Sequence, residues 1–338
     1  MGLRDACHRT PPESNFLYEI MGKADSCPAP TKPNLNWHLI NHSKADHDLR
    51  HLIVDLSRAC KYISYAIQTT EAGLAGTKNE FGEDQLALDV LADNLIREFL
   101  CESGLVCCYI SEEQPDIVEL DPEGQYSVVF DPLDGSSLVD ANFAIGSIFG
   151  IYKDGNVIGA TPREQVAAMY VLYGPRTLLV VSLGNGKGVH EFILNDVGEF
   201  VLLRDHLGIG DDAKNYSPGN LRAITTNPGY KKAIDSWQEE EKTLRYSGCM
   251  VADIHHILSK GQGVFSNIGG GEGSKYPDGK LRHVFECGPF AFLAEEAGGA
   301  ASDGTMAILD KEITSVDQRT QIIIGSKNDV ESVASLVS

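Results

Sequence analysis

The heptapeptide Asp131-Pro-Leu-Asp-Gly-Ser-Ser137 places two carboxylates, a glycine and two hydroxyls directly after an apolar run, 126–130. Such a run is typical of a buried strand, whose end would present both carboxylates in one place. Carboxylate oxygens bind Mg²⁺, usually beside substrate phosphate, and backbone amides and serine hydroxyls at a helix start bind phosphate. A simple turn is the alternative, because Asp-Pro and Asp-Gly are common turn formers. The spacing favours a magnesium-dependent enzyme that acts on a phosphate ester.

More carboxylates follow other apolar runs. Glu112 and Glu113 come directly after the run 106–110, and Glu286 ends a third run before a Gly-Pro pair. Asp89 lies in the segment Leu-Asp-Val-Leu. Like charges at strand ends repel and raise one another's pKa, and a bound cation removes that repulsion. The set therefore indicates one shared metal site.

The composition limits the partners and the compartment. The chain has 338 residues and a net charge of −20, from 28 Lys and Arg against 48 Asp and Glu. A nucleic-acid-binding protein would show a basic face, whereas an anionic small molecule needs only a local positive pocket. No apolar stretch reaches the ~20 residues of a membrane helix, and no secretory signal is visible. We expect a cytoplasmic protein without membrane contact, whose eight cysteines are reduced and mostly buried.

The hydrophobic pattern predicts three regions: an extended N-terminal arm over 1–44, an α+β domain over 45–210 and an α/β domain over 211–338. In the first domain, amphipathic helices are expected at 45–71 and 84–101, separated by a loop over 72–82. Strands are expected at 105–111, 126–131, 145–152, 177–182 and 190–194, with one candidate helix at 163–171.

The Gly- and Asp-rich tract 205–220 is the expected domain boundary. Beyond it, helices are expected at 228–241, 250–259 and 288–297, strands at 263–267, 281–286 and 320–325, and a helix at the C-terminus. Ligands of open α/β sheets bind beyond the carboxyl ends of the strands, which is where the acidic residues fall in this interpretation.

Together, these motifs resemble the fructose-1,6-bisphosphatase family over about residues 45–335. The heptapeptide alone would also fit inositol phosphatases, but the full set in this order is specific. The resemblance is closest to the sedoheptulose-1,7-bisphosphatase branch, through the segments 139–143, 174–177, 217–223, 319–321 and 325–328.

The resemblance implies a layered αβαβα sugar-phosphatase fold, in which two mixed sheets are sandwiched between helix layers. It implies Mg²⁺-dependent hydrolysis of the C1 phosphate of sedoheptulose 1,7-bisphosphate, with fructose 1,6-bisphosphate, or both sugars, as the alternative. A catalytically inactive binding protein on the same fold is a third alternative, which loss of a metal carboxylate would indicate. A homodimer is expected, with a tetramer as the alternative.

The resemblance also assigns roles to individual residues. Two or more Mg²⁺ ions per subunit would be bound by Glu112, Asp131, Asp134, Glu286 and the carbonyl of Leu133. The water that attacks the phosphate would lose its proton to Asp89 and Glu113. Gly135, Ser136 and Ser137 would hold the transferred phosphate. The distal phosphate would be bound by Asn220, Arg222, Arg245, Tyr246 and Lys280, with Arg245 reaching into a neighbouring subunit's site. Arg222 and Lys280 as plain surface charges, and Tyr246 as a packing aromatic, are the alternatives.

Two departures from the family pattern concern regulation. Chloroplast members of the branch carry a redox-active cysteine pair where this chain has 69–76, which contains no cysteine. Animal fructose bisphosphatases bind AMP partly through a lysine at the position of Gln125. Neither control is therefore expected here.

Overall fold

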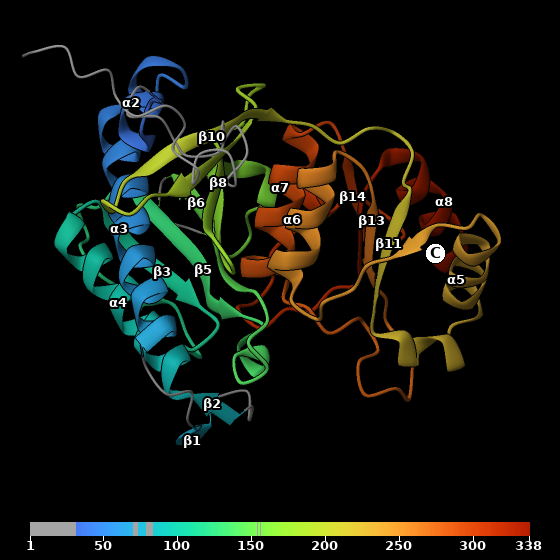
Figure 1. Ribbon diagram of the computed structural model, residues 1–338. Helices are drawn as coiled ribbons and strands as arrows, with labels where there is room; N and C mark the ends of the chain where they lie inside the picture. Colours follow the sequence, from blue (N-terminus) through green and yellow to red (C-terminus); the bar gives the residue numbers. More distant parts are fainter. Residues whose placement is uncertain (1–31, 70–73, 79–83, 154, 156) are drawn as a thin grey trace, which may run out of the picture.

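Two β-sheets and three layers of helices alternate through the molecule (Figure 1). The computed structural model describes residues 32–69, 74–78, 84–153, 155 and 157–338. Both sheets contain parallel and antiparallel pairs. The predicted α/β fold with two mixed sheets between helix layers is confirmed. No helix in these described ranges is long and apolar enough to cross a membrane.

The larger sheet has eight strands in the order β10-β9-β8-β7-β6-β5-β3-β4. Only β3 and β5 run parallel, and every other neighbouring pair is antiparallel. Its strands are β3 (Val106–Ser111), β4 (Val118–Glu119), β5 (Tyr126–Asp134), β6 (Ile145–Lys153), β7 (Gln165–Tyr173), β8 (Thr177–Ser182), β9 (Val189–Leu194) and β10 (Phe200–Leu207).

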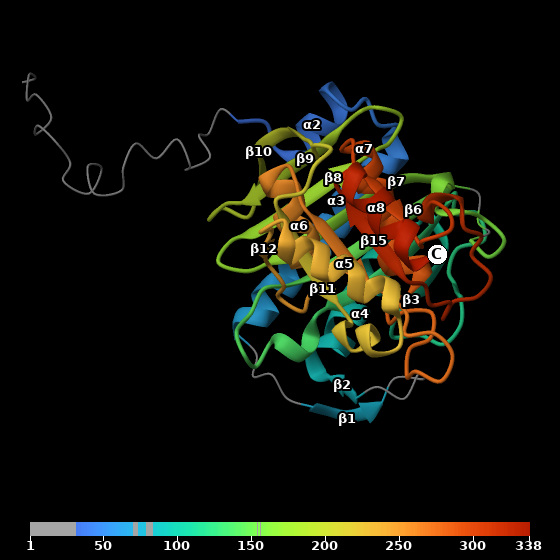
Figure 2. The same cartoon turned by 90° about the vertical axis from the view of Figure 1, so that its right-hand side faces the viewer.

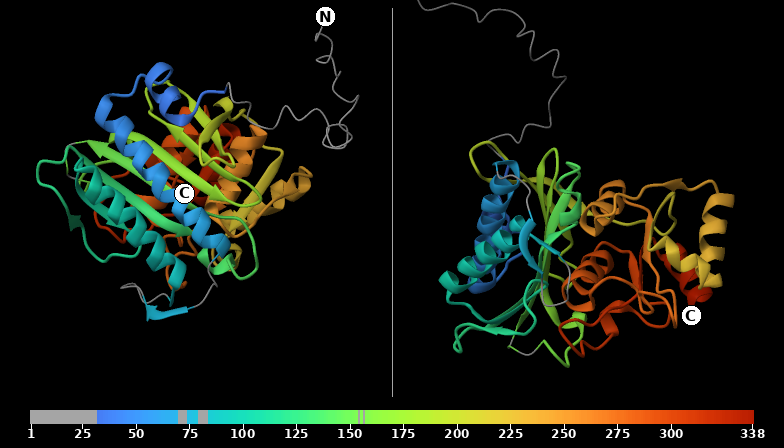
Figure 3. Two further views of the ribbon diagram at one scale, coloured as in Figure 1. Left: turned by 60° about the vertical axis from the view of Figure 1, so that its left-hand side comes forward. Right: turned by 90° about the horizontal axis from the view of Figure 1, so that it is seen from below.

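Helices cover both faces of the larger sheet (Figure 3). One face carries α3 (His47–Thr69) and α4 (Ala87–Ser103), and the other carries α6 (Met250–Lys260) and α7 (Gly288–Glu296). Along β7, Met169 and Val171 belong to the core under α3 and α4, while Tyr170 and Leu172 belong to the core under α6 and α7. Because both faces are buried, the strand is apolar throughout and does not alternate with polar residues.

The smaller sheet has five strands in the order β12-β11-β13-β15-β14. It consists of β11 (Asn215–Gly219), β12 (Thr243–Leu244), β13 (Val264–Asn267), β14 (Ala300–Ser302) and β15 (Ile322–Gly325). The outer layer is formed by α5 (Pro228–Glu239) and the C-terminal α8 (Lys327–Val337), which lie side by side over this sheet (Figure 2). Tyr230 and Trp237 of α5 fill the core between these two helices and the sheet.

The structure differs from the sequence predictions in several places. The candidate helix at 163–171 is wrong, because its apolar run 166–171 belongs to the doubly buried strand β7, which follows a short 3₁₀ turn at Pro162–Glu164. The expected loop over 72–82 contains β1 (Leu74–Lys78), which pairs with β2 (Asp84–Leu86). The described part of the expected extended arm contains a helix, α2 (Leu35–Asn41), capped by the Asn34 side chain; residues 1–31 of the arm lie outside the described residues.

Candidate active site

A cavity of about 290 Å³ lies where residues of the two sheets meet. All five residues predicted to bind metal line it: Glu112, Asp131, Leu133, Asp134 and Glu286. Gly135, Ser136 and Ser137 line the same cavity. Segments that are 149 or more residues apart in the sequence, 112–137 and 286, therefore meet at one place.

The parallel pairing of β3 and β5 brings two of the acidic segments together. Ser111 pairs with Phe130, and the backbone N–H of Glu112 donates to the Phe130 carbonyl at 3.2 Å. Glu112 and Asp131 therefore both follow the same register position at the carboxyl ends of neighbouring parallel strands, which is where α/β sheets bind ligands.

Asp134 is held by the N-terminus of α6. Its Oδ2 accepts a hydrogen bond from the Val251 backbone N–H at 2.7 Å and one from the Cys249 thiol at 3.0 Å. The ladder between β5 and β6 shifts register between Asp131 and Asp134, so both carboxylates lie at the cavity although they are three positions apart. The positive end of the helix dipole favours a negative charge at this position.

Glu286 lies in a π-helical turn, His283–Cys287, that leads directly into α7. Its Oε2 accepts a hydrogen bond from the Arg282 backbone N–H at 2.5 Å. The predicted strand over 281–286 is therefore wrong. This segment is apolar because Val284 and Phe285 are buried in a core cluster with β3 and β5 residues, and not because it is extended.

The three carboxylates Asp131, Asp134 and Glu286 offer oxygens that lie within 4.8 Å of one another. Burial first, and then the charges of Glu112, Asp134 and Glu286, raise the pKa of Asp131 well above its usual range. Burial also raises the pKa of Asp134, and burial together with the Asp134 charge raises that of Glu286 to about 7. Buried carboxylates in mutual repulsion fit a divalent cation, which restores their charged form.

Gly135 starts the turn that presents the two serines. Its φ is +79°, a left-handed conformation, and a Cβ at this position would lie 2.8 Å from the Cys249 Cβ. The turn continues into a short 3₁₀ helix, Ser136–Leu138. The first N–H groups of a helical turn have no partner within it, so this turn can bind phosphate oxygens through its amides and hydroxyls.

A second cavity of about 340 Å³ adjoins the first, since Tyr246, Asn267 and Lys280 line both. Asn220 and Arg222 line this second cavity. Asn220 has a left-handed φ of 48° and begins the 3₁₀ helix Leu221–Thr225, which carries Arg222. The second cavity, which contains basic residues, thus shares lining residues with the acidic first cavity.

Three predicted residues are not among those that line the two cavities. Asp89 is buried in the first turn of α4, and the backbone N–H of Glu113 donates to the Ser111 hydroxyl at 3.2 Å. Arg245 is exposed, and its side chain donates to the Leu244 carbonyl at 2.8 Å. Their predicted roles therefore remain proposals.

The sequence analysis did not select several residues that line the cavities, among them Asn267, Tyr276, Arg282 and Arg319. Asn267 ends β13, and its Oδ1 accepts a hydrogen bond from the Lys280 backbone N–H at 3.1 Å. A polar residue at the end of a predicted strand was the available signal for Asn267. Arg319 hydrogen-bonds to the Lys280 carbonyl, a contact across 39 positions that no local pattern indicates.

The raised pKa values predict how stability depends on pH and Mg²⁺. Without metal, Glu286 releases its proton on unfolding between about pH 4.5 and 7, so the free energy of unfolding should fall as pH rises through this window, on the order of 3 kcal/mol for this group. A cation replaces the proton, so Mg²⁺ should raise the melting temperature more at pH 8 than at pH 5. Thermal melts in EDTA and in Mg²⁺ at both pH values measure this; an equal rise would contradict it.

Two family models match the chain. The model described as Fructose-1-6-bisphosphatase, N-terminal domain, matches residues 36–205, and the model for the C-terminal domain of the same family matches residues 209–338. A class 1 fructose-1,6-bisphosphatase of Geobacter sulfurreducens is 48% identical over 299 residues, which cover 88% of this chain and 93% of the relative. A chloroplastic sedoheptulose-1,7-bisphosphatase of Triticum aestivum is 44% identical over 288 residues, covering 84% of this chain and 72% of the relative.

Solved structures agree with these matches. A Leishmania major fructose-1,6-bisphosphatase in holo form superposes with a TM-score of 0.83 at 30% identity and covers 91% of this chain and 99% of its own. A Toxoplasma gondii protein provisionally named a sedoheptulose-1,7 bisphosphatase has a TM-score of 0.82 at 36% identity, covering 90% and 99%. The acidic cavity, the fold and these matches lead to one conclusion: the chain belongs to the fructose-1,6-bisphosphatase family and is a sugar bisphosphatase.

Proposed function

We propose that this protein hydrolyses the C1 phosphate of fructose 1,6-bisphosphate and accepts sedoheptulose 1,7-bisphosphate as a second substrate. The two joined cavities carry this proposal, because one offers acidic side chains beside a phosphate-binding turn and the other offers fixed basic groups. A ligand with a phosphate at each end fits this distribution of charge.

The preference for the six-carbon sugar rests on the relatives. Relatives such as that of Geobacter sulfurreducens are named for fructose 1,6-bisphosphate, whereas the sequence segments 139–143 and 217–223 favour the seven-carbon branch. The wheat relative and the Toxoplasma gondii structure carry the seven-carbon name and support the second substrate. One additional carbon in a binding pocket typically changes kcat/KM by about 10–200-fold, so the two sugars can both be substrates.

In the proposed reaction Glu112, Asp131, Asp134, Glu286 and the Leu133 carbonyl would bind the cations, of which we propose two or more Mg²⁺ per subunit. Oxygen donors and buried carboxylates suit Mg²⁺ rather than a softer metal. Bound there, the cations would supply positive charge to the phosphoryl oxygens and the leaving oxygen.

The remaining chemistry belongs to the side chains and backbone. The amides of Gly135 and Ser136 and the hydroxyl of Ser137 would orient the C1 phosphoryl group, which requires mainly positioning and charge neutralisation. Asp89 and Glu113 would accept the proton of the attacking water. Asn220, Arg222, Tyr246 and Lys280 would hold the distal phosphate.

We also propose that the active unit is a homodimer. Arg245 is exposed and lines neither cavity of its own chain, which leaves its guanidinium available to a neighbouring subunit's distal phosphate. Sedimentation of the enzyme at assay concentration tests this, and full activity in a monomer would contradict it.

The substrate proposal is tested by measuring phosphate release from both bisphosphates with Mg²⁺. We expect turnover of both sugars, with the higher kcat/KM for fructose 1,6-bisphosphate. Fructose 6-phosphate, which lacks the C1 phosphate, is the matched control and should release none. A higher kcat/KM for the seven-carbon sugar would reverse the assigned order, and no release from either would contradict the function.

Arg222→Ala should raise KM for the bisphosphate by about 10–100-fold and change kcat little, since a hydrogen bond to a charged group contributes about 1.5–3 kcal/mol. Steady-state kinetics on fructose 1,6-bisphosphate measure this. Lys231→Ala is the control, because Lys231 is an exposed cation paired with Asp235 on α5. An unchanged KM in Arg222→Ala would reassign Arg222 to the surface.

A further inference from the structure

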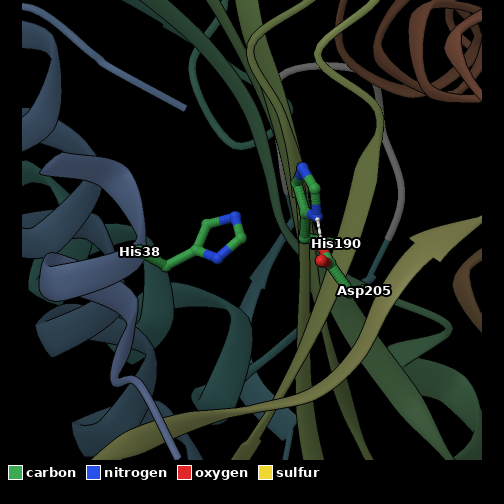
Figure 4. Close-up of side chains that lie close together, drawn as sticks. All are labelled: His38, His190 and Asp205. Atoms are coloured by element: carbon green, nitrogen blue, oxygen red, sulfur yellow. Dashed lines mark hydrogen bonds and ion pairs between the residues drawn. The ribbon is translucent and has the colours of Figure 1, made fainter. Parts of the chain in front are cut away.

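Outside the candidate active site, a second group of possible metal ligands lies near β9 and β10, at the edge of the larger sheet that is farther from β3 and β5. His38 of α2, His190 of β9 and Asp205 of β10 converge there (Figure 4). Each offers a ligand atom, and these atoms lie within 4.8 Å of one another. Three strands, β8, β7 and β6, separate β9 from β5, so this group is independent of the active site.

The His38 ring is the unusual member of the group. It is 0% exposed, and both of its ring nitrogens are buried without a hydrogen-bond partner among the described residues. Burying a polar group without a partner is unfavourable, so a ligand bound to one of these ring nitrogens would stabilise the buried ring. Burial first, and then the neighbouring His190, lower the pKa of His38 to about 4. The ring is therefore neutral near pH 7 and has a lone pair available.

The two nitrogens of His190 both face acceptors. Its Nε2 lies 2.9 Å from the Lys187 carbonyl, and its Nδ1 lies 2.6 Å from Oδ1 of Asp205. A carbonyl can only accept, so Nε2 must donate to it. A carboxylate also only accepts, so in this tautomer the Nδ1 lone pair faces Asp205, and a proton or a metal ion between them would remove the mismatch.

A metal ion accounts for more of the geometry than a proton does. A proton on His190 satisfies Nδ1 and Asp205 but leaves both nitrogens of His38 without a partner. The donation of Nε2 to a backbone carbonyl is the arrangement that orients metal-binding histidines. We propose that His38, His190 and Asp205 bind a divalent transition-metal ion, and that two imidazoles and one carboxylate fit Zn²⁺.

The surroundings allow such an ion to enter and to complete its coordination. The Asp205 side chain is 44% exposed, and the neighbouring His206 is 66% exposed, so water or His206 can supply the fourth ligand. Zn–N bonds of about 2.0–2.1 Å bring ligand atoms to roughly 3.3 Å from one another. The ligand atoms now lie within 4.8 Å of one another, and His190 Nδ1 lies 2.6 Å from Asp205 Oδ1. Rotation of the exposed Asp205 side chain would therefore have to lengthen this pair while the wider separations shorten.

The ion would attach α2, near the start of the described residues, to the larger sheet. The segment before α2 already contacts β10, since the Leu202 N–H donates to the Pro33 carbonyl at 2.9 Å and Asn34 donates to Glu199 at 2.9 Å. A metal bond from His38 to β9 and β10 would add a second attachment on the helix itself. The site is therefore a structural one, and catalysis with Mg²⁺ should not require it.

The test compares the number of Zn²⁺ ions bound by the wild type and by variants of this site. A comparison is needed because the carboxylates of the candidate active site can also take up Zn²⁺. Metal-stripped wild type, His38→Leu and Asp205→Asn are titrated with Zn²⁺ alone and the bound ions counted by calorimetry and atomic emission. We expect each variant to bind one ion fewer per chain. Zn²⁺ should also raise the melting temperature more in the wild type than in either variant.

His51→Ala is the matched control. His51 is exposed on α3, where its ring centroid lies 4.1 Å from that of His47, so it is a surface imidazole outside the proposed site. This control should bind as many ions as the wild type. Equal counts in the wild type, His38→Leu and Asp205→Asn would overturn the proposal.

Discussion

Asp134→Asn should lower kcat at least about 10³-fold while the protein stays folded. Loss of one carboxylate from the cation-binding set removes several kcal/mol of transition-state stabilisation, and about 1.4 kcal/mol corresponds to a factor of ten. The amide oxygen of Asn can still accept the hydrogen bond that the Val251 N–H donates. Steady-state phosphate release with Mg²⁺ and a thermal melt in EDTA measure both effects.

The melt separates a metal ligand from a structural residue. Asp134 adds to the repulsion that raises the pKa of Asp131, so without metal the Asn variant should melt at the wild-type temperature or above it. Asp140→Asn is the control, since Asp140 is exposed and does not line the cavity; it should keep normal kcat. Near-normal turnover in Asp134→Asn would remove Asp134 from the metal site.

Gly135→Ala should destabilise the protein by about 2–4 kcal/mol and lower kcat/KM by about 100-fold. The left-handed conformation alone is unfavourable for alanine by about 1–2 kcal/mol, and the new Cβ would lie 2.8 Å from that of Cys249. The turn must shift to relieve this contact, and a displacement of about 1 Å in a positioning group can reduce the rate by two orders of magnitude. Denaturant unfolding and steady-state kinetics measure the two effects.

Gly104→Ala provides the comparison for Gly135→Ala. Gly104 also has a positive φ, +62°, but a Cβ there would meet nothing within 4 Å, and it follows α4 away from both cavities. It should lose about 1–2 kcal/mol, from the left-handed conformation alone, and no activity. Equal kcat/KM losses in both variants would show that the strained backbone, and not the displaced turn, limits activity.

Local patterns predicted the parts of the active site that a single strand carries. The run before Asp131 is apolar because β5 is buried, and its polar end lines the first cavity. The same reasoning applied to Glu112 after β3. Both could be placed because a strand ends where an apolar run meets charged residues.

Features that depend on distant packing could not be predicted in this way. The run 166–173 in β7 and the pair Val284–Phe285 in the π-helical turn are both apolar, and periodicity cannot distinguish a doubly buried strand from a buried turn or helix. Arg319 and His38 gain their surroundings from strands far away in the sequence. Only the tertiary structure shows that their side chains face a cavity or another ring.

The chain passes from the larger sheet to the smaller one between Leu207 and Asn215, and the residues that line the first cavity come from both sides of this connection. Asp131 precedes it, whereas Lys280 and Glu286 follow it. Genetic recombination between relatives at this junction would combine an N-terminal half from one protein with a C-terminal half from another, and both halves would contribute residues to the first cavity. Such hybrids should be functional only when the cavity-lining residues of the two halves are compatible. The two halves are therefore expected to evolve together.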